Sequence, residues 1–574
     1  MNLKLLQSGI WIGLFLSTVV FGTPPKPLRV IALADLHGAL EGQKSTKNGT
    51  EVTFGGAALL SSYVEILKSA ATAAQGNSIP AVIIDAGDLF QGTLVSNSAE
   101  GKPVIAFYNY LAVDAAAIGN HDFDFGPTGP DSVPIHPGED PVGALKDRMA
   151  QARFPFLSAN IFEGDGTRPS WAKPSAMIKR DGLKIGVIGF STQETPVMTN
   201  RKNIAGLAFD DPVPSIIDEA KRLRSQGADY VILVGHAGGF CTNNAPDHIT
   251  DLGTCSKDEL FNILDRLPAG TIDVAVGGHT HAGIAKIYKG VPVLEAFSHG
   301  QAVGWVTIGD RSPPVPQLVE VCSAGALQGN QVSCNSDYLK TAKSIVPATF
   351  LGNEIKPDDA VTKLLQGDFD RVSALKARPL GVTTQGVFER AYYDENSLGN
   401  LFVAVLYGTF KDQVDTVLMN NGGLRADIGQ KALTYNDVFE AMPFDNILAV
   451  LELPGDQLLK ILEIGVARMD GGQSWFGISF HADRCKILSA SLNGIPIDPA
   501  HKYRVLTSDF LVLGGAHLDL AKIKPEQYQM LDTLPNMREE LVGALSSYKE
   551  PLVPVNFFDP RKPSQVIDHI CGTE

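Results

Sequence analysis

The first half of the chain alternates short apolar runs with longer stretches in which apolar residues recur every three or four positions. The short runs contain few polar positions, which is typical of strands buried on both faces of a sheet. We expect these strands at 28–34, 81–85, 115–118, 156–159, 184–190, 229–234, 272–276 and 303–308. The stretches between them predict helices at 56–74, 104–111, 142–152, 213–226 and 257–266. This order predicts an α/β sandwich with a layered sheet and flanking helices.

The second half repeats this pattern on a smaller scale. A proline-rich stretch at 310–317 ends the first series, and residues 358–376 predict a connecting helix. From about residue 381 the pattern restarts. Helices are expected at 396–410 and 454–469, and strands at 416–419, 486–491 and 503–507. We interpret this half as a second, smaller α/β domain.

The N-terminal residues predict a signal peptide over residues 1–22. Lys4 precedes an apolar run at 5–20, and Val20-Phe21-Gly22 gives small residues at the positions that a signal peptidase prefers. The run is somewhat shorter than the roughly 20 residues of a spanning helix, so an uncleaved anchor is the weaker alternative. The C-terminus has no apolar tail of the lipid-anchor type. We therefore expect a secreted or periplasmic protein with no stable membrane anchor after cleavage.

Composition narrows the class of partner. The 574 residues exceed what one hydrophobic core usually holds, and 44% of them are hydrophobic, as in ordinary globular proteins. The formal net charge of −15 argues against a nucleic acid polymer as partner, because such binding needs basic residues facing phosphates. A small phosphorylated substrate remains compatible with it.

The six cysteines of an exported chain suggest disulfides. Six cysteines allow 15 pairings. The simplest local pairs are Cys241–Cys255 and Cys322–Cys334, which would leave Cys485 with Cys571. The chain has no C-x-x-C pair, so a zinc ribbon is not expected.

Polar residues with ligand chemistry follow five of the predicted strands directly. The clusters are Asp35-Leu36-His37, Gly87-Asp88, Gly119-Asn120-His121-Asp122, Gly235-His236 and Gly278-His279-Thr280-His281. The carboxyl ends of strands in α/β sheets converge on the ligand crevice. Residues about 240 positions apart can therefore meet at one place, and the five clusters together are far more specific than any one of them.

These residue types suit two divalent metal ions. Carboxylate, amide oxygen and imidazole are ligands for Zn, Mn or similar cations. One predicted set is Asp35, His37 and His281, and the other is Asn120, His236 and His279. Asp88 is suited to bridge the two sets, because one carboxylate can give an oxygen to each cation. Two such cations about 3.5–4 Å apart form a clamp for displacement at phosphorus.

The five clusters carry a family resemblance. In their order they resemble calcineurin-like metallophosphoesterases, and residues 115–126 resemble the 5′-nucleotidase family in particular. The resemblance implies a four-layer metallophosphoesterase α/β sandwich at 27–310, a linker with a helix at 311–380 and a 5′-nucleotidase C-terminal substrate-binding domain at 381–565. His281 departs from that family, which often has Gln or Asn there, but its nitrogen can still coordinate.

The resemblance also implies functional roles. The family residues that match His121 and Asp124 form a catalytic pair, in which the imidazole stabilises charge and the carboxylate orients it. The substrate loop of the family matches Asn420, Asn421, Gly423 and Arg425, with the Arg on the phosphate and the Asn on the base. A guanidinium suits phosphate because it is planar and bidentate. Phe444 matches the residue that stacks on one face of the base.

Two departures from the family pattern make the resemblance a weaker guide to nucleoside binding than to phosphate hydrolysis. The resemblance places a second stacking ring after a Gly-Gly-Asp-Gly motif, but this chain has Leu513-Gly514-Gly515-Ala516-His517-Leu518 there. His517, Trp475 and Phe476 are possible substitutes. A second family Arg is either absent or replaced by Lys411.

The predicted function is an exported two-metal phosphohydrolase that most resembles enzymes removing phosphate from 5′-nucleotides by attack of a metal-bound hydroxide. Its partner would be a small-molecule nucleotide or another phosphate ester. The alternatives are a 2′,3′-cyclic-nucleotide phosphodiesterase, a UDP-sugar or dinucleotide pyrophosphatase, a hydrolase of sulfur compounds, and a catalytically inactive binding module. The complete ligand set argues against the last of these.

Overall fold

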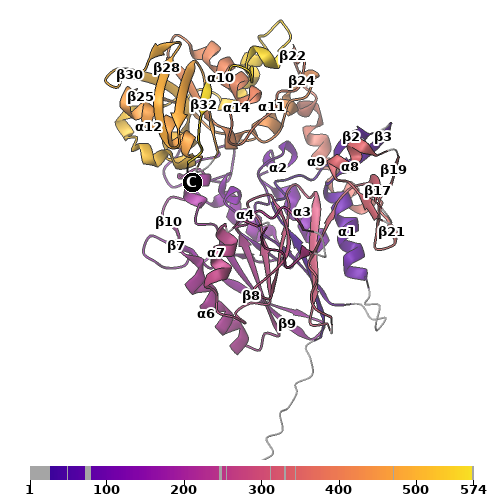
Figure 1. Ribbon diagram of the computed structural model, residues 1–574. Coiled ribbons are helices and arrows are strands. Elements are labelled where there is room, and N and C mark those ends of the chain that lie inside the picture. Colours follow the sequence, from indigo (N-terminus) through magenta and orange to yellow (C-terminus); the bar gives the residue numbers. More distant parts are fainter. Residues whose placement is uncertain are drawn as a thin grey trace, which may run out of the picture.

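The computed structural model describes residues 26–571 apart from 48, 71–78, 245–247, 254, 257, 311, 329–330, 343 and 469–470. The predicted signal peptide at 1–22 lies outside the described residues. The described part forms two α/β domains, with the second domain (orange and yellow) above the first (Figure 1). The predicted mixed α/β class with two domains is confirmed.

Two six-stranded sheets pack face to face in the first domain. The first sheet has the order β16 (Gln317–Glu320), β15 (Ala302–Ile308), β1 (Leu28–Leu33), β4 (Ala81–Asp85), β5 (Ala115–Ala117) and β6 (Phe156–Leu157). The second has the order β13 (Gly283–Tyr288), β14 (Val291–Ala296), β12 (Val274–Gly277), β11 (Tyr230–His236), β9 (Leu183–Ser191) and β8 (Ser175–Arg180). Side chains of both sheets, including Val30, Ile84, Val187, Ile232 and Val276, form one buried cluster between them.

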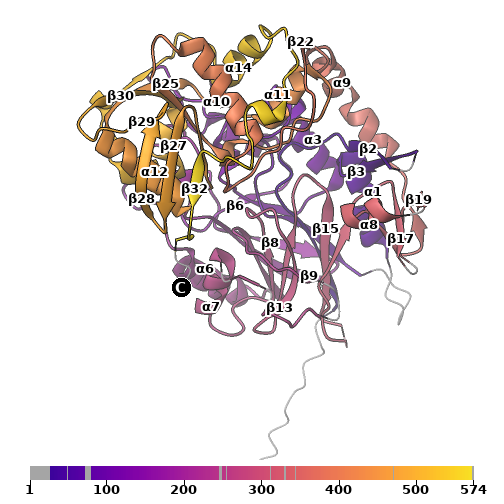
Figure 2. The ribbon, with the colours of Figure 1, turned by 45° about the horizontal axis from the view of Figure 1, so that its top comes forward.

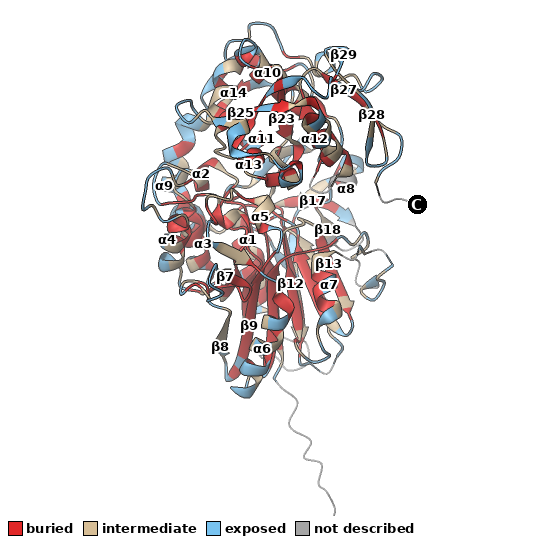
Figure 3. Cartoon of the chain, turned by 90° about the vertical axis from the view of Figure 1, so that its left-hand side faces the viewer, coloured by how far each residue is buried: buried red, intermediate tan, exposed pale blue. Residues whose placement is uncertain are grey.

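Helices cover the outer face of each sheet, which gives four layers. Leu60 of α1 (Ala57–Ser69) and Phe107 of α3 (Lys102–Leu111) pack with residues of the first sheet. Ile216 of α6 (Pro212–Ser225) and Leu260 of α7 (Glu259–Arg266) pack with residues of the second sheet. In Figure 3 the strands are mostly buried, whereas α6 and α7 turn exposed residues outward.

The order of parallel strands places the predicted site. β1, β4, β5 and β6 are parallel to one another, and so are β9, β11, β12 and β14. Their carboxyl ends therefore meet at one edge of the sandwich. Each predicted strand of this domain is formed, with ends that differ by at most two residues. Smaller elements complete the domain: β2 (Gln43–Lys47), β3 (Thr50–Phe54), α2 (Leu94–Asn97), η1 (His121–Phe123), α4 (Gly143–Gln151), β7 (Ile161–Glu163), α5 (Thr195–Met198) and β10 (Leu207–Phe209).

The segment expected to be a linker adds structure to the first domain. β16 pairs with β15 and so extends the first sheet beyond the expected boundary at residue 310. It is followed by β17 (Ala324–Gln328), β18 (Gln331–Ser333), α8 (Ser336–Thr341), β19 (Ile345–Pro347), β20 (Thr349–Phe350) and β21 (Asn353–Glu354). The predicted connecting helix is α9 (Asp359–Lys376), whose N-cap Asp358 accepts hydrogen bonds from the backbone N–H of Ala360 and Val361. Figures 1 and 2 show it along one side, between the domains.

The second domain is built on a mixed five-stranded sheet. Its order is β26 (Gln473–Trp475), β23 (Thr416–Asn420), β30 (Lys502–Ser508), β25 (Leu448–Pro454) and β31 (Tyr528–Met530). A four-stranded sheet has the order β29 (Ile495–Pro496), β28 (Lys486–Leu492), β27 (Ile478–Asp483) and β32 (Gln565–Ile567). The helices are α10 (Ser397–Phe410), α11 (Tyr435–Ala441), α12 (Gly455–Ala467), α13 (Asp509–Val512) and α14 (Met537–Leu545). The remaining elements are β22 (Pro379–Thr383), β24 (Ala432–Thr434), η3 (Asn421–Gly423), η4 (Gly515–Ala521), η5 (Pro525–Gln527) and η6 (Pro554–Asn556).

Three disulfides tie loops and the C-terminal segment to this frame. They join Cys241 to Cys255, Cys322 to Cys334, and Cys485 to Cys571, so the local pairing is confirmed. Among the described residues, no helix combines the length and apolar character that crossing a membrane requires.

Candidate functional site

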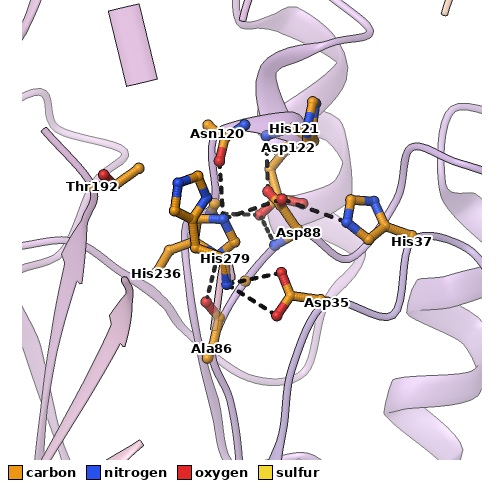
Figure 4. A network of polar contacts seen from close by, with 12 residues as sticks. Asp35, His37, Ala86, Asp88, Asn120, His121, Asp122, Thr192, His236 and His279 are labelled. Carbon is orange, nitrogen blue, oxygen red and sulfur yellow. Dashed lines mark hydrogen bonds and ion pairs between the residues drawn. The ribbon is translucent and has the colours of Figure 1, made fainter. Parts of the chain in front are cut away.

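The predicted ligand residues meet at the carboxyl-end edge of the two sheets. Asp35 and His37 follow β1, Asp88 follows β4, and Asn120 follows β5. His236 is the last residue of β11, and the turn carrying His279 and His281 follows β12. Figure 4 shows the side chains from these separate loops pointing toward one another.

Several ligand residues have an unusual backbone conformation. The φ angles of Asp35, His37, Asp88, His279 and His281 are 49°, 49°, 56°, 78° and 55°, which lie in the left-handed region. Non-glycine residues there cost of order 1–3 kcal/mol and persist where the surroundings fix them. Here backbone hydrogen bonds hold the loops together, since Asp35 N donates to Gly87 O at 3.1 Å and His37 N to Asp88 O at 3.0 Å. The direction of each side chain is therefore set by a strained backbone that hydrogen bonds between the loops hold in place.

The first predicted set of ligands is brought together. Ligand atoms of Asp35, His37 and His281 all lie within 4.8 Å of one another. His37 Nδ1 is 2.7 Å from the carbonyl oxygen of Gln91, which fixes the proton on Nδ1 and leaves the lone pair of Nε2 facing inward. His37 Nε2 lies 3.0 Å from His281 Nε2.

The second set surrounds the carboxylate of Asp88. His236 Nε2 lies 3.1 Å from Asp88 Oδ2 and 3.0 Å from Asn120 Oδ1. His236 Nδ1 bonds the carbonyl oxygen of Ala86 at 2.9 Å, so this ring also turns Nε2 inward. On the other side, Asp88 Oδ2 lies 3.7 Å from His37 Nε2. Asp88 is thus between the two sets, as the bridging role requires.

His279 joins the cluster through its backbone and its ring. Its backbone N–H donates to both carboxylate oxygens of Asp35 at 3.0 Å, and its ring centroid is 5.0 Å from that of His236. Its Nε2 is turned away from the cluster, 3.4 Å from Oε2 of Glu194.

The donor set fits cations. Asp35 and Asp88 are almost fully buried, and no described Lys or Arg forms an ion pair with either. Burial and the charge of Asp88 raise the pKa of Asp35 well above its usual value. Burial also opposes ionisation of Asp88, but the charges of His236 and His121 hold its pKa well below the usual range. Buried carboxylates beside inward-facing imidazole lone pairs are costly unless a cation binds them.

His121 and Asp124 lie beside this cluster and face a pocket. Asp124 Oδ2 is 2.6 Å from His121 Nδ1, and Thr199 Oγ1 donates to Asp124 Oδ1 at 2.6 Å. The backbone N–H of His121 donates to Asp88 Oδ1 at 2.8 Å, which ties the pair to the ligand cluster. Asp124 therefore fixes the orientation of the imidazole and turns its Nε2 toward the pocket.

The second domain supplies the opposite wall of this pocket. Arg425 Nη2 lies 2.8 Å from His121 Nε2, and the guanidinium lies over the ring of Phe444, 5.2 Å from its centroid. Asn420 and Gly423 also line the pocket. Asn421 lies outside that lining, since its side-chain amide bonds Ser474 Oγ and the carbonyl oxygen of Asp394.

Comparisons with known proteins agree with this geometry. Residues 28–283 match the family of calcineurin-like phosphoesterases, and residues 379–522 match the 5′-nucleotidase C-terminal domain. The chain belongs to the 5′-nucleotidase family of calcineurin-like phosphoesterases. The family prediction and the class of metal-dependent phosphoester hydrolase are confirmed.

Relatives of this family cover most of the chain. Protein UshA of Yersinia enterocolitica is 26% identical over 81% of this chain and 81% of its own length. Snake venom 5′-nucleotidase of Naja atra is 26% identical over 85% of this chain and 90% of its own length. In fold, the chain is similar to the 5′-nucleotidase precursor from Thermus thermophilus, with a TM-score of 0.70, 22% identity, and coverage of 92% of this chain and 99% of that one.

The sequence suggested that the pocket lacks a second aromatic ring, but the structure places one there. Phe510, on α13, lines the same pocket as Phe444. Of the suggested substitutes, Trp475 donates from Nε1 to Gln473, and Phe476 stacks on Tyr407 at 3.9 Å. The sequence pattern did not mark Phe510 as a pocket residue, because an apolar residue in a helix-forming stretch is ordinarily assigned to the core.

The chain carries another guanidinium, that of Arg390, near the ligand cluster. Lys411 is an exposed C-cap of α10. Arg390 lies near the site instead: burial, followed by the charges of Arg425 and Arg390, lowers the pKa of His299 to about 4. Arg390 sits in a polar loop before α10, where no apolar pattern marks it.

Three further buried groups support the ligand loops. Asp122 accepts backbone hydrogen bonds from Asp88, Leu89 and Gly119 at 3.2, 2.8 and 2.8 Å. Glu295 accepts from Thr280 Oγ1 at 2.5 Å and so holds the turn between His279 and His281. The ring of His299 stacks on that of His37, with centroids 5.4 Å apart. Only Asp122 had a sequence signal, because it belongs to the Gly-Asn-His-Asp cluster.

Proposed function

We propose that this protein is a two-metal phosphohydrolase that removes phosphate from 5′-nucleotides. The observation that carries the proposal is the position of Arg425, which reaches from the second domain to within 2.8 Å of His121 Nε2. The same pocket is lined by Phe444 and Phe510. A phosphate group beside the metal-ligand cluster would thus meet a guanidinium, and a planar base beyond it would meet two aromatic rings.

The residues that would hold the metals form two sets, one for each cation. Asp35, His37 and His281 would hold one cation, and Asn120, His236 and His279 the other, with Asp88 shared. Bound divalent cations would supply Lewis acidity that activates water and neutralises charge on the phosphoryl oxygens. Asn120 Nδ2, which is buried without a hydrogen-bond partner, supports a role of this amide through its oxygen.

The chain's own groups act on the phosphoryl group and the leaving oxygen. Arg425 would bind non-bridging oxygens with its planar fork, which matches their spacing. With a phosphate group between it and Arg425, His121 would hold a proton on Nε2 and donate it toward the oxygen of the leaving alcohol. Asp124 accepts the Nδ1 proton of His121 and thereby stabilises the charged ring when Nε2 is protonated.

The nucleoside would lie against the second domain. Phe444 and Phe510 offer aromatic faces, and base stacking is worth about 1–3 kcal/mol per base in single-stranded nucleic-acid sites. Asn420 lines the pocket and offers hydrogen bonds to the base or ribose. The relatives named 5′-nucleotidase support this choice of substrate.

We also infer that the protein is exported. The support is the predicted signal peptide together with three disulfides, which form and persist in oxidising compartments.

A second cavity favours nucleotide sugars or dinucleotides as a second candidate class. It lies on the other side of Arg425 and is lined by His37, His281, His299 and Arg390. A phosphomonoester has no second organic substituent on its phosphorus, whereas a diester must direct one away from the site. This cavity offers room for such a group outside the aromatic pocket.

A substrate panel tests the proposal. The purified protein, loaded with Mn²⁺ or Zn²⁺, is offered 5′-mononucleotides, 2′,3′-cyclic nucleotides, UDP-sugars and p-nitrophenyl phosphate. We expect the highest kcat/KM for a 5′-mononucleotide. Faster turnover of a UDP-sugar would favour the second class, and no turnover of any ester by metal-loaded protein would refute the enzymatic assignment.

A further inference from the structure

The histidines of the cluster are held in two different ways. His37 and His236 each bond a backbone carbonyl through Nδ1, at 2.7 and 2.9 Å, and turn Nε2 toward the cluster. His279 is reversed, because its Nε2 lies 3.4 Å from the carboxylate of Glu194. A neutral imidazole carries one proton, so the nitrogen that donates outward decides which nitrogen has a free lone pair.

We propose that Glu194 is a positioning residue for His279. Its carboxylate accepts the Nε2 proton and so leaves Nδ1 of His279 as the nitrogen that can bind a cation. This inference rests on the proposed two-metal site. Carboxylates that accept the second N–H of a metal-binding histidine fix both its tautomer and its orientation, and they increase its basicity.

The surroundings hold Glu194 in place for this role. It is the N-cap of α5, and its carbonyl oxygen accepts a hydrogen bond from Val197 N at 2.8 Å. Its own backbone N–H donates to Thr192 Oγ1 at 3.1 Å, and that hydroxyl donates to Glu259 Oε2 at 2.6 Å. The backbone of Glu194 is therefore fixed on both sides, although its side chain is 54% exposed.

Glu194 also lies at the boundary between the domains. α5 packs against η4 of the second domain. Arg201, just after α5, forms an ion pair with Asp519 of η4 at 3.5 Å. Glu194 thus lies between the ligand cluster and the surface on which the second domain rests.

Metal binding tests the proposal directly. Wild type, Glu194→Ala, Glu194→Gln and Glu259→Gln are stripped of metal and titrated with Mn²⁺ alone, followed by calorimetry. We expect wild type to bind two ions and Glu194→Ala to bind one of them about 10–100-fold more weakly. Glu194→Gln keeps an oxygen that can accept the Nε2 proton, so it should recover much of that loss. Glu259→Gln removes a nearby charge but keeps an oxygen that can accept the hydrogen bond of Thr192 Oγ1, so the support of Glu194 should survive and Mn²⁺ should bind as in wild type.

A second readout separates positioning from general damage. Hydrolysis of p-nitrophenyl phosphate by Glu194→Ala should be restored by excess Mn²⁺, with KM unchanged. Equal Mn²⁺ affinities in wild type and Glu194→Ala would overturn the proposal, and so would an equal loss in Glu259→Gln. If wild type itself binds no Mn²⁺, the proposed two-metal function fails instead, and that result is distinguishable because it does not depend on Glu194.

Discussion

The Nε2 atoms of His37 and His281 face each other at 3.0 Å. Burial is the main factor that lowers the pKa of both rings well below the usual value. His37 donates from Nδ1 to Gln91, so its Nε2 presents a lone pair to His281. His281 Nε2 can donate a hydrogen bond to that lone pair, or, with its own proton on Nδ1, it can bind a cation together with His37. This pair is therefore suited to share one metal ion.

Removal of metal should therefore cost both activity and stability. We expect a chelator to abolish ester hydrolysis and added Mn²⁺ or Zn²⁺ to restore it. At a free ion concentration 100 times Kd, each ion should stabilise the folded protein by about 2.7 kcal/mol, which thermal unfolding measures. Asp88→Asn should remove most of this gain because both sets share that carboxylate, whereas Asp218→Asn, exposed on α6, should retain it. An unchanged unfolding temperature after metal loading would contradict the prediction.

A graded series tests the pair formed by His121 and Asp124. His121→Ala should lower kcat by about 10²–10⁴-fold, the range for loss of a proton-transfer group. Asp124→Asn leaves the ring in place without its charged partner and should cost less. Thr199→Val removes only the hydrogen bond to Asp124, worth about 0.5–1.5 kcal/mol, and should cost about 2–12-fold. The reverse order of effects would show that His121 does not carry the chemistry.

The planar, bidentate guanidinium of Arg425 should contribute more to kcat/KM than its positive charge alone. Loss of a hydrogen bond to a charged group costs about 1.5–3 kcal/mol, so Arg425→Ala should lower kcat/KM for p-nitrophenyl phosphate by about 10–150-fold. Arg425→Lys keeps the charge and should recover only part of this. Arg390→Ala is the matched control, because Arg390 is exposed and lies on the side of the second cavity. It should affect monoesters least.

The pocket lined by Phe444 and Phe510 should affect the binding of substrates that carry a base, and of those alone. Phe444→Ala and Phe510→Ala should each raise KM for a 5′-nucleotide by about 5–150-fold, the equivalent of 1–3 kcal/mol of stacking. KM for ribose 5-phosphate, which has no base, should not change. Phe476→Ala, whose ring stacks on Tyr407 away from this pocket, should behave like wild type toward both. Equal effects on the two substrates would mean that the rings shape the domain rather than bind the base.

The sequence alone predicted those site residues whose positions follow from the order of the strands. Asp35, Asp88, Asn120 and His236 each follow an apolar run, and the parallel order of those strands brings their carboxyl ends to one edge. No side-chain packing had to be known for that inference. The strands themselves were equally readable, because their apolar runs are buried on both faces.

What the sequence did not reveal depends on tertiary contacts. Phe510 reads as a core residue until the orientation of α13 is known, and Arg390 lies in a loop with no periodic signal. The left-handed backbone at Asp35 and His279 has only a weak local signal, since Asp and His adopt it more often than most residues. Hydrogen bonds between loops far apart in the chain accompany it. Glu194 and Glu295 act on histidines from other loops, so their spacing along the chain carries no information about the contact.

The boundary between the domains should respond to pH through Asp509. This carboxyl is almost fully buried and accepts hydrogen bonds from Asn200 Nδ2 of the first domain at 2.7 Å and from Ile447 N at 3.0 Å. Burial raises the pKa of Asp509 to about 6. A raised carboxyl pKa means that the folded state binds the proton more tightly than the unfolded state. The stabilising contribution is therefore complete below about pH 4 and is lost as pH rises through 6.

The difference between pKa 3.8 and about 6 corresponds to about 3 kcal/mol. Asp509→Asn mimics the protonated carboxyl and cannot ionise. Its stability relative to wild type should therefore increase by about 3 kcal/mol between pH 4 and pH 8, measured by urea unfolding at each pH. Asp412→Asn, an exposed position in the same domain, should show no such trend. A constant difference between wild type and Asp509→Asn across this range would show that Asp509 ionises without penalty, and hence that the domain boundary is open to water there.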